Sequence, residues 1–197
     1  AFQSKNLTSV IIPETVSKLE QFAFAGNSTL THIEIPESVT TLSTEIINGA
    51  SLPDDEAYLY ARNPDGSEDK TNLICYGGAN KNPVIPEGVT TIGYRAFWNN
   101  KLLSVEIPNT VTTIEGGAFL DNNLTHIDIP NSVTSLDGTA FNNNKLVDEE
   151  AFIYARKADG EKDPTTIIGY GGANKTNVIV PDGVLKIKDD AFFDCGI

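Results

Sequence analysis

Two histidines, His32 and His126, are the residues whose type and spacing most suggest chemistry. Each stands two residues before a carboxylic acid, Glu34 or Asp128. Imidazole beside carboxylate suits acid–base catalysis and metal binding. The two pairs are 94 residues apart in equivalent contexts, so the copying of one surface position also explains them. Either chemistry would need a third ligand or a nucleophile, which neither pair offers. We therefore predict no catalytic residues, no metal site and no cofactor.

Two acidic loops suggest a different chemistry, the binding of calcium. Asn63, Asp65, Ser67 and Asp69 are spaced like the oxygen ligands of a calcium loop. The equivalent stretch 157–163 has lysines at two of its positions, and neither loop has the downstream glutamate of an EF-hand. An Asp-Gly turn between two strands explains both loops better.

Aromatic residues recur in two equivalent stretches, 57–62 and 151–156, each of which ends in an arginine. The outer aromatic pairs are Tyr58 and Tyr60 in the first stretch, and Phe152 and Tyr154 in the second. Aromatic and arginine side chains are enriched at binding hot spots. Residues two apart in a strand share a face, so the same side chains could instead attach a hairpin to the body of the protein. Both interpretations remain open.

The elements that must position these residues follow from a repeat. Six segments share the pattern seen in 124–141, in which spaced apolar residues lead to Ile-Pro, then Val, Leu and Ala-Phe. The marker prolines are Pro13, Pro36, Pro86, Pro108, Pro130 and Pro181. The unit has 22 to 23 residues, and two intervals are longer by almost 30. A period in this range is typical of a leucine-rich solenoid, in which each unit forms one coil.

The longer intervals are themselves copies. Residues 57–62 recur as 151–156, and 76–81 as 170–175, each time 94 residues later. We therefore predict one solenoid over residues 1–197, duplicated as 7–101 and 102–197. Strand, Asp-Gly turn and strand predict a β-hairpin insert at about 53–81 and another at about 147–174. We expect each hairpin to project from the solenoid or to pair along its flank.

One coil can be derived from residue periodicity. Alternation in 33–35 points Ile33 and Ile35 inward and Glu34 outward, which predicts a short parallel strand. Pro36 then ends the ladder. The expected fold is a right-handed, mostly β solenoid of six coils, with a short helical turn at each Ala-Phe. Asparagine-rich stretches such as 142–144 are expected to close the coils as tolerant turn residues.

The repeat units resemble the BspA-type leucine-rich repeats of bacterial surface proteins. The resemblance covers nearly the whole chain outside the two inserts, although Ile46-Ile47 replaces Ala-Phe in the second unit. It implies an exported, cell-surface or secreted protein with a role in adhesion. It also implies that ligands bind on the outward strand face.

Stacking the units places equivalent outward residues in columns. One column holds Ser9, His32, Asn82, Ser104, His126 and Asn177, and its neighbour holds Ile11, Glu34, Val84, Glu106, Asp128 and Ile179. The centre of this face is acidic and suits a polar or basic partner. A solvated sheet face that binds nothing would carry the same polar residues.

Composition narrows the choice of partners. The chain of 197 residues has a formal charge of −13, which argues against nucleic acid and anionic membranes. It has no apolar run long enough to span a membrane, and no methionine, so we expect it to be part of a longer product. Cys75 and Cys195 lie several coils apart, and we predict that no disulfide joins them.

Three functions fit these features. In the first, a non-enzymatic, monomeric module binds a protein or glycan through two sets of side chains. These are the outward residues His32, Glu34, Glu106, His126 and Asp128, and the aromatic residues Tyr58, Tyr60, Phe152 and Tyr154. In the second, the chain is a structural spacer with no ligand of its own. The third, a hydrolase with paired carboxylates, has little support because no two acids stand out from the repeat.

Overall fold

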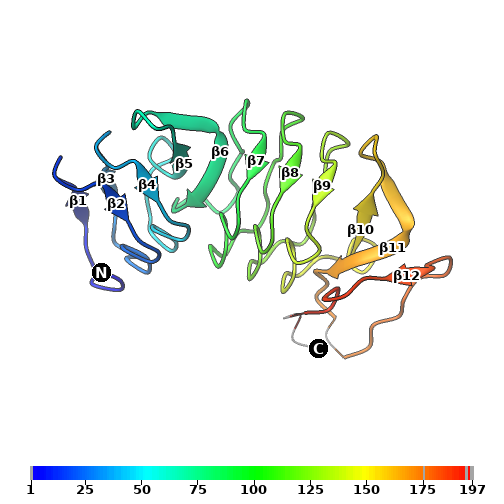
Figure 1. Ribbon diagram of the computed structural model, residues 1–197. Helices are drawn as coiled ribbons and strands as arrows, with labels where there is room; N and C mark the ends of the chain where they lie inside the picture. Colours follow the sequence, from blue (N-terminus) through cyan, green and yellow to red (C-terminus); the bar gives the residue numbers. More distant parts are fainter. Residues whose placement is uncertain (1, 175, 194, 196–197) are drawn as a thin grey trace.

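The protein is an elongated β-solenoid whose short strands lie side by side along the chain (Figure 1). This computed structural model describes residues 2–174, 176–193 and 195. Within those ranges the chain forms strands, bridges and turns, and no helix. The short helical turns expected at Ala-Phe are therefore absent there. The residue before this pair instead has a positive φ in several coils, 59° at Phe22 and 55° at Arg95, which a right-handed helix excludes.

The predicted outward strand forms at the N-terminal end of the solenoid. Strand β1 (Ser9–Ile11) pairs in parallel with β3 (His32–Glu34), with Ser9 opposite His32 and Ile11 opposite Glu34. Farther along, the same column continues as a single bridge between Val84 and Glu106. The alternation is as expected, since Ile33 is buried while its two neighbours are exposed.

A second ladder runs along the solenoid on the Val-Leu side of the coils. Strand β2 (Lys18–Leu19) pairs with β4 (Thr41–Leu42). Strands β7 (Thr91–Ile92), β8 (Thr113–Ile114) and β9 (Ser135–Leu136) pair in parallel in that order. Strand β12 (Lys186–Ile187) occupies the same position in the last coil. In β2, β4, β7, β8 and β9 one apolar side chain per strand points toward the core, whereas both residues of β12 are exposed.

Each insert is a hairpin that also completes a turn of the solenoid. The first joins β5 (Tyr58–Arg62) to β6 (Glu68–Tyr76), and the second joins β10 (Phe152–Arg156) to β11 (Lys162–Tyr170). The inner end of β6 pairs in parallel with β7, and that of β11 with β12.

The inserts therefore change the number of coils. Leu73 stands opposite Ile92 and Ile167 opposite Ile187, so each insert supplies its own residue to the second ladder. The solenoid has about eight turns, rather than the six expected from the repeat units. The reason is burial: Leu73 and Ile167 are fully buried, so each hairpin has to continue the core instead of leaving it.

Aromatic rings form a continuous stack inside the solenoid. Phe97, Phe119 and Phe141 come from consecutive Ala-Phe pairs, with centroids 5.0 and 5.1 Å apart. Tyr76 of the first hairpin extends the stack, 5.0 Å from Phe97. In the second unit Ile46 and Ile47 replace Ala-Phe and are fully buried, so the core continues through that departure.

The asparagines near each Ala-Phe pair are buried and satisfy the backbone between coils. Asn122 accepts hydrogen bonds from the N–H groups of Asn100 and Leu102, at 3.1 and 3.0 Å. Its amide nitrogen donates to the carbonyls of Phe97 and Phe119, at 2.8 and 2.9 Å. Asparagine supplies donors and acceptors at once, so Asn122 serves as a core residue. In 142–144 the outer two asparagines are buried as well, whereas Asn143, with φ of 53°, is a tolerant turn residue as expected.

Candidate functional site

The structure places most of the predicted contact residues in two groups, each on a hairpin coil and the coil before it. His32 and Glu34 lie on β3, immediately before the coil that carries Tyr58 and Tyr60. In the second half, His126 and Asp128 precede the coil that carries Phe152 and Tyr154. Glu106 lies apart from both groups, on a coil between them and opposite Val84.

A glutamate of each hairpin coil binds the histidine before it. One Glu56 carboxylate oxygen lies 2.9 Å from Nδ1 of His32, and the other accepts the backbone N–H of Ile33 at 3.0 Å. Glu150 repeats this arrangement with His126 and Ile127, at 2.5 and 3.1 Å. Each carboxylate thus accepts a backbone N–H of the preceding coil and fastens the hairpin coil to it.

The sequence-based pairing of each histidine with the acid two residues later was therefore incomplete. The hydrogen bond that the Glu56 carboxylate accepts from His32 is the main cause that raises the pKa of His32, and Glu34 adds only a weaker electrostatic effect. Burial alone would raise the pKa of Glu56, but its bonds to His32 and Ile33 lower it. The available sequence signal was the recurrence of a glutamate 24 residues after each histidine.

The aromatic residues of the hairpins are half-buried and contact the solenoid. The Tyr58 hydroxyl donates to the Val84 carbonyl at 2.9 Å, and its ring lies 5.1 Å from that of Tyr76. Phe152 lies against Tyr170 in the same way, at 5.2 Å. Burial raises the pKa of Tyr58 to about 12. Packing therefore accounts for part of their role, and the exposed part of each ring is left for contact.

An arginine at the end of each outer hairpin strand joins three segments. Arg62 donates to the carbonyl of Gly66 at the hairpin tip and to that of Ile35 in the preceding coil, at 3.0 and 3.4 Å. Arg156 makes the equivalent bonds to Gly160 and Ile129, at 3.0 and 3.1 Å. Each arginine thereby holds its hairpin against the preceding coil.

The two hairpin coils differ in charge at one position of this surface. Lys162 of β11 lies over the Tyr154 ring, with its Nζ 5.1 Å from the centroid, whereas the first copy has Glu68 at the equivalent place. A cavity of about 120 Å³ lies beside Tyr154 and is lined also by Glu150 and Ile127. The second copy thus presents a carboxylate, an aromatic ring and an ammonium group within one small site.

The acidic loops at the hairpin tips form turns. The Asp65 carboxylate accepts the backbone N–H and the hydroxyl of Ser67, at 3.0 and 2.6 Å, and these bonds lower its pKa. Asp69 binds Thr71 in the same way. Within the described part of the chain, no group of three or more histidine, cysteine or acidic side chains is placed to hold a metal ion. The carboxylates here fix backbone turns.

The two cysteines lie in different coils, Cys75 in the first hairpin coil and Cys195 in the last coil. Cys75 is fully buried and donates to Asn48 Oδ1 at 2.7 Å, and burial raises its pKa to about 12. Cys195 lies near the second hairpin and donates to the Tyr170 carbonyl at 3.1 Å. No disulfide joins Cys75 to Cys195.

A cluster around Trp98 was not singled out from the sequence. The Arg95 guanidinium lies over the rings of Tyr94 and Trp98, 5.2 Å from each centroid, and binds the fully buried Glu45 at 3.2 Å. Glu45 and Arg95 come from coils on either side of the first hairpin coil, so the ion pair ties those coils together. The sequence does carry a sign of this ion pair: Glu45 and Arg95 have opposite charges at the same repeat position, directly before the Ala-Phe site or its replacement.

Fold and site together define a leucine-rich solenoid with two hairpin-bearing coils. The sequence matches the BspA type leucine rich repeat region in six copies, over residues 1–54 and 74–153. Because this is about two thirds of its length, the chain belongs to that family. None of the curated proteins matches it. No helix of the described residues is long and apolar enough to cross a membrane.

Solved structures support the same fold. A leucine rich cell surface protein from Faecalibacterium prausnitzii is 24% identical with a TM-score of 0.55, over 96% of this chain and 52% of that one. The pneumococcal vaccine antigen PcpA is 20% identical with a TM-score of 0.50, over 72% and 44%. The chain thus spans about half the length of these proteins. At such identities the likeness concerns the fold alone.

Proposed function

We propose that this chain is a non-enzymatic interaction module of a bacterial cell-surface or secreted protein, with a role in adhesion. Membership of the BspA-type repeat family supports an interaction role. The description of the Faecalibacterium protein as a cell surface protein supports the location. Solenoids of stacked repeats offer extended faces that suit contact with macromolecules.

One observation carries the proposal of a contact surface. On both hairpin coils a glutamate two residues before the half-buried aromatic pair binds the histidine of the preceding coil. Glu56 and Arg62 hold the first hairpin against β3, at the distances given above. Two sets of side chains that are far apart in sequence therefore lie on adjacent coils, His32 and Glu34 with Tyr58 and Tyr60, and His126 and Asp128 with Phe152 and Tyr154.

The charge of this surface favours a basic or polar partner. Glu34, Glu106 and Asp128 are all exposed on the outward columns, and the whole chain carries −13. Opposite charges across an interface mainly increase the association rate and specificity. We propose that a monomer binds a protein or glycan through this face.

Charge reversal on this face tests the proposal. The variant Glu34→Lys/Glu106→Lys/Asp128→Lys is compared with Glu14→Lys/Glu87→Lys/Asp182→Lys, which changes the same charge at exposed turns beside the marker prolines. Each protein is immobilised and tested against extracellular-matrix proteins and a glycan array. We expect the outward-face variant to lose about tenfold or more in affinity, with the control unchanged.

The same experiment distinguishes the alternative role of a spacer. A spacer would show no binding above background for the unmodified chain or for either variant. Equal loss in both variants would indicate a response to net charge only. Either result would contradict the assignment of this face.

A further inference from the structure

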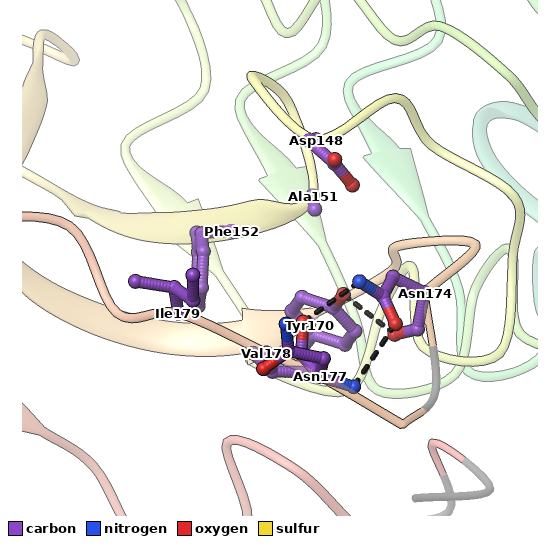
Figure 2. A pocket seen from close by; sticks show the side chains of 8 residues that line it. All are labelled: Asp148, Ala151, Phe152, Tyr170, Asn174, Asn177, Val178 and Ile179. Carbon is purple, nitrogen blue, oxygen red and sulfur yellow. Dashed lines mark hydrogen bonds between the residues drawn. The ribbon is translucent and has the colours of Figure 1, made fainter.

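A second cavity, of about 220 Å³, lies between the second hairpin coil and the last coil (Figure 2). Its wall includes Phe152, Val178, Ile179 and the largely buried Tyr170, and Asp148 stands at its edge. Drug-sized molecules occupy cavities of roughly 300–1,000 Å³. This cavity has room for a single side chain or a comparably small group.

The first half of the chain contains the same coil and serves as an internal reference. There the Tyr58 hydroxyl donates to the Val84 carbonyl at 2.9 Å, which fastens the hairpin to the next coil. The amide nitrogen of Asn80 also reaches the Asp54 carboxylate, at 3.5 Å. Both polar groups are therefore engaged by the protein itself.

Two sequence differences remove these contacts in the second half. Phe152 replaces Tyr58 and has no hydroxyl. The connection from Asn174 to Pro181 is one residue longer than that from Asn80 to Pro86. Asn174 now donates to the carbonyl of Asn177 at 2.7 Å, away from Asp148 (Figure 2).

The Asp148 carboxylate is left available as a consequence. Among the described residues it has no hydrogen-bond or ion-pair partner, and the described residues that line the cavity include no lysine or arginine. The rings of Phe152 and Tyr170 meet edge to face at 63°, with centroids 5.2 Å apart, and both line the same cavity. A carboxylate beside aromatic rings attracts a cation both by charge and through the ring quadrupoles.

We propose that this cavity binds the side chain of a lysine presented by a protein partner. Its methylene groups would lie along Phe152, Val178 and Ile179, while the ammonium group binds the Asp148 carboxylate. A lysine has this division into an apolar stem and a compact charged end. The inference rests on the proposed interaction role and gives it a chemical class of partner.

The test uses the intact chain and a blocked amino acid, N-α-acetyl-L-lysine methylamide, followed by NMR titration. We expect saturable shifts from residues around Phe152 and Tyr170. Asp148→Asn should weaken binding about fivefold or more. The matched control Asp54→Asn changes the equivalent residue of the first coil and should leave binding unchanged. Unfolding midpoints of both variants, compared with that of the unmodified chain, verify that the fold persists.

Other probes identify the source of the cation. The N-ε-acetylated derivative has no charge and should not bind. Cadaverine represents free diamines, and methyl glucoside represents neutral sugars. Tighter binding of cadaverine or of the glucoside than of the blocked lysine would overturn the proposal. Two further results would also overturn it: no binding of the blocked lysine to the unmodified chain, or a loss of its binding in Asp54→Asn equal to that in Asp148→Asn.

This titration is independent of the proposed function. The variant Glu34→Lys/Glu106→Lys/Asp128→Lys keeps all cavity residues and should still bind the blocked lysine. If the proposed lysine site is wrong, the blocked lysine will not bind although the chain still captures its partner. If the proposed function is wrong, the chain will capture no partner although it still binds the blocked lysine.

Discussion

At the residue scale, the position of each hairpin tip depends on one glycine. Gly66 and Gly160 have φ of +88° and +81°. A Cβ at Gly66 would lie 2.0 Å from the carbonyl oxygen of Glu37, and one at Gly160 would lie 1.5 Å from that of Asn131. Both tips thus touch the turn of the preceding coil at backbone distance, which no other residue type permits.

Alanine at Gly66 should destabilise the chain by about 2 kcal/mol or more, because the conformational cost of positive φ adds to a clash with backbone. The control is Gly88→Ala, since Gly88 has φ of +93° but open space around a Cβ. It should show the conformational cost alone, about 1 kcal/mol. Urea unfolding measures both values. If the two variants lost the same free energy of unfolding, the hairpin tip would be able to move away from the preceding coil without cost.

At the element scale, the first hairpin coil is joined to β3 by a titratable contact. Glu56 binds His32 through one oxygen and the Ile33 N–H through the other. Because the pKa of His32 is raised above its ordinary value of 6.5, protonated His32 stabilises the folded state. This stabilisation is complete below pH 6.5 and is lost as the pH rises through the raised pKa. The lowered pKa of Glu56 contributes above 4.5 and is lost as pH falls through the lowered pKa.

The contact should therefore stabilise the protein most between about pH 4.5 and 6.5. We expect His32→Ala to lower the free energy of unfolding more at pH 5.5 than at pH 8, measured by urea unfolding. Asn82→Ala, at the equivalent place in its own coil, should cost the same at both pH values. A pH-independent loss in His32→Ala would show that the imidazolium form does not stabilise the contact.

At the scale of the whole molecule, each coil contacts mainly its two neighbours. The stacked rings of Phe97, Phe119 and Phe141 run through successive coils, each about 5 Å from the next. Stability in such an array is approximately a sum of unit and interface contributions. A defect in one coil is therefore expected to weaken adjacent coils more than distant ones.

Phe119→Ala should lower stability by about 3–5 kcal/mol, because it opens a cavity at a fully buried ring. Hydrogen exchange followed by mass spectrometry should show the greatest loss of protection in the coils of Phe97 and Phe141, and less around β3. Leu103→Ala, which is 53% exposed, is the control and should change little. Uniform loss of protection along the chain would instead indicate all-or-none unfolding.

The sequence by itself determined the period, the duplication and the two hairpins. Regular spacing fixes which side chains of one coil face the core, so the alternation at Ile33 and the burial of Ala-Phe could be predicted. The repeat also indicated the family. These properties depend on residues close together in the chain, or on identical residues at a constant interval.

Tertiary structure alone decided which coils are neighbours. The 22-residue period predicted that the second and third units would stack directly, but the burial of Leu73 makes the first hairpin a coil between them. Glu56 consequently becomes the partner of His32. The cavity beside Asp148 depends on a connection one residue longer than its copy. Such contacts follow from how a long insert returns to the core, which periodicity within a unit does not specify.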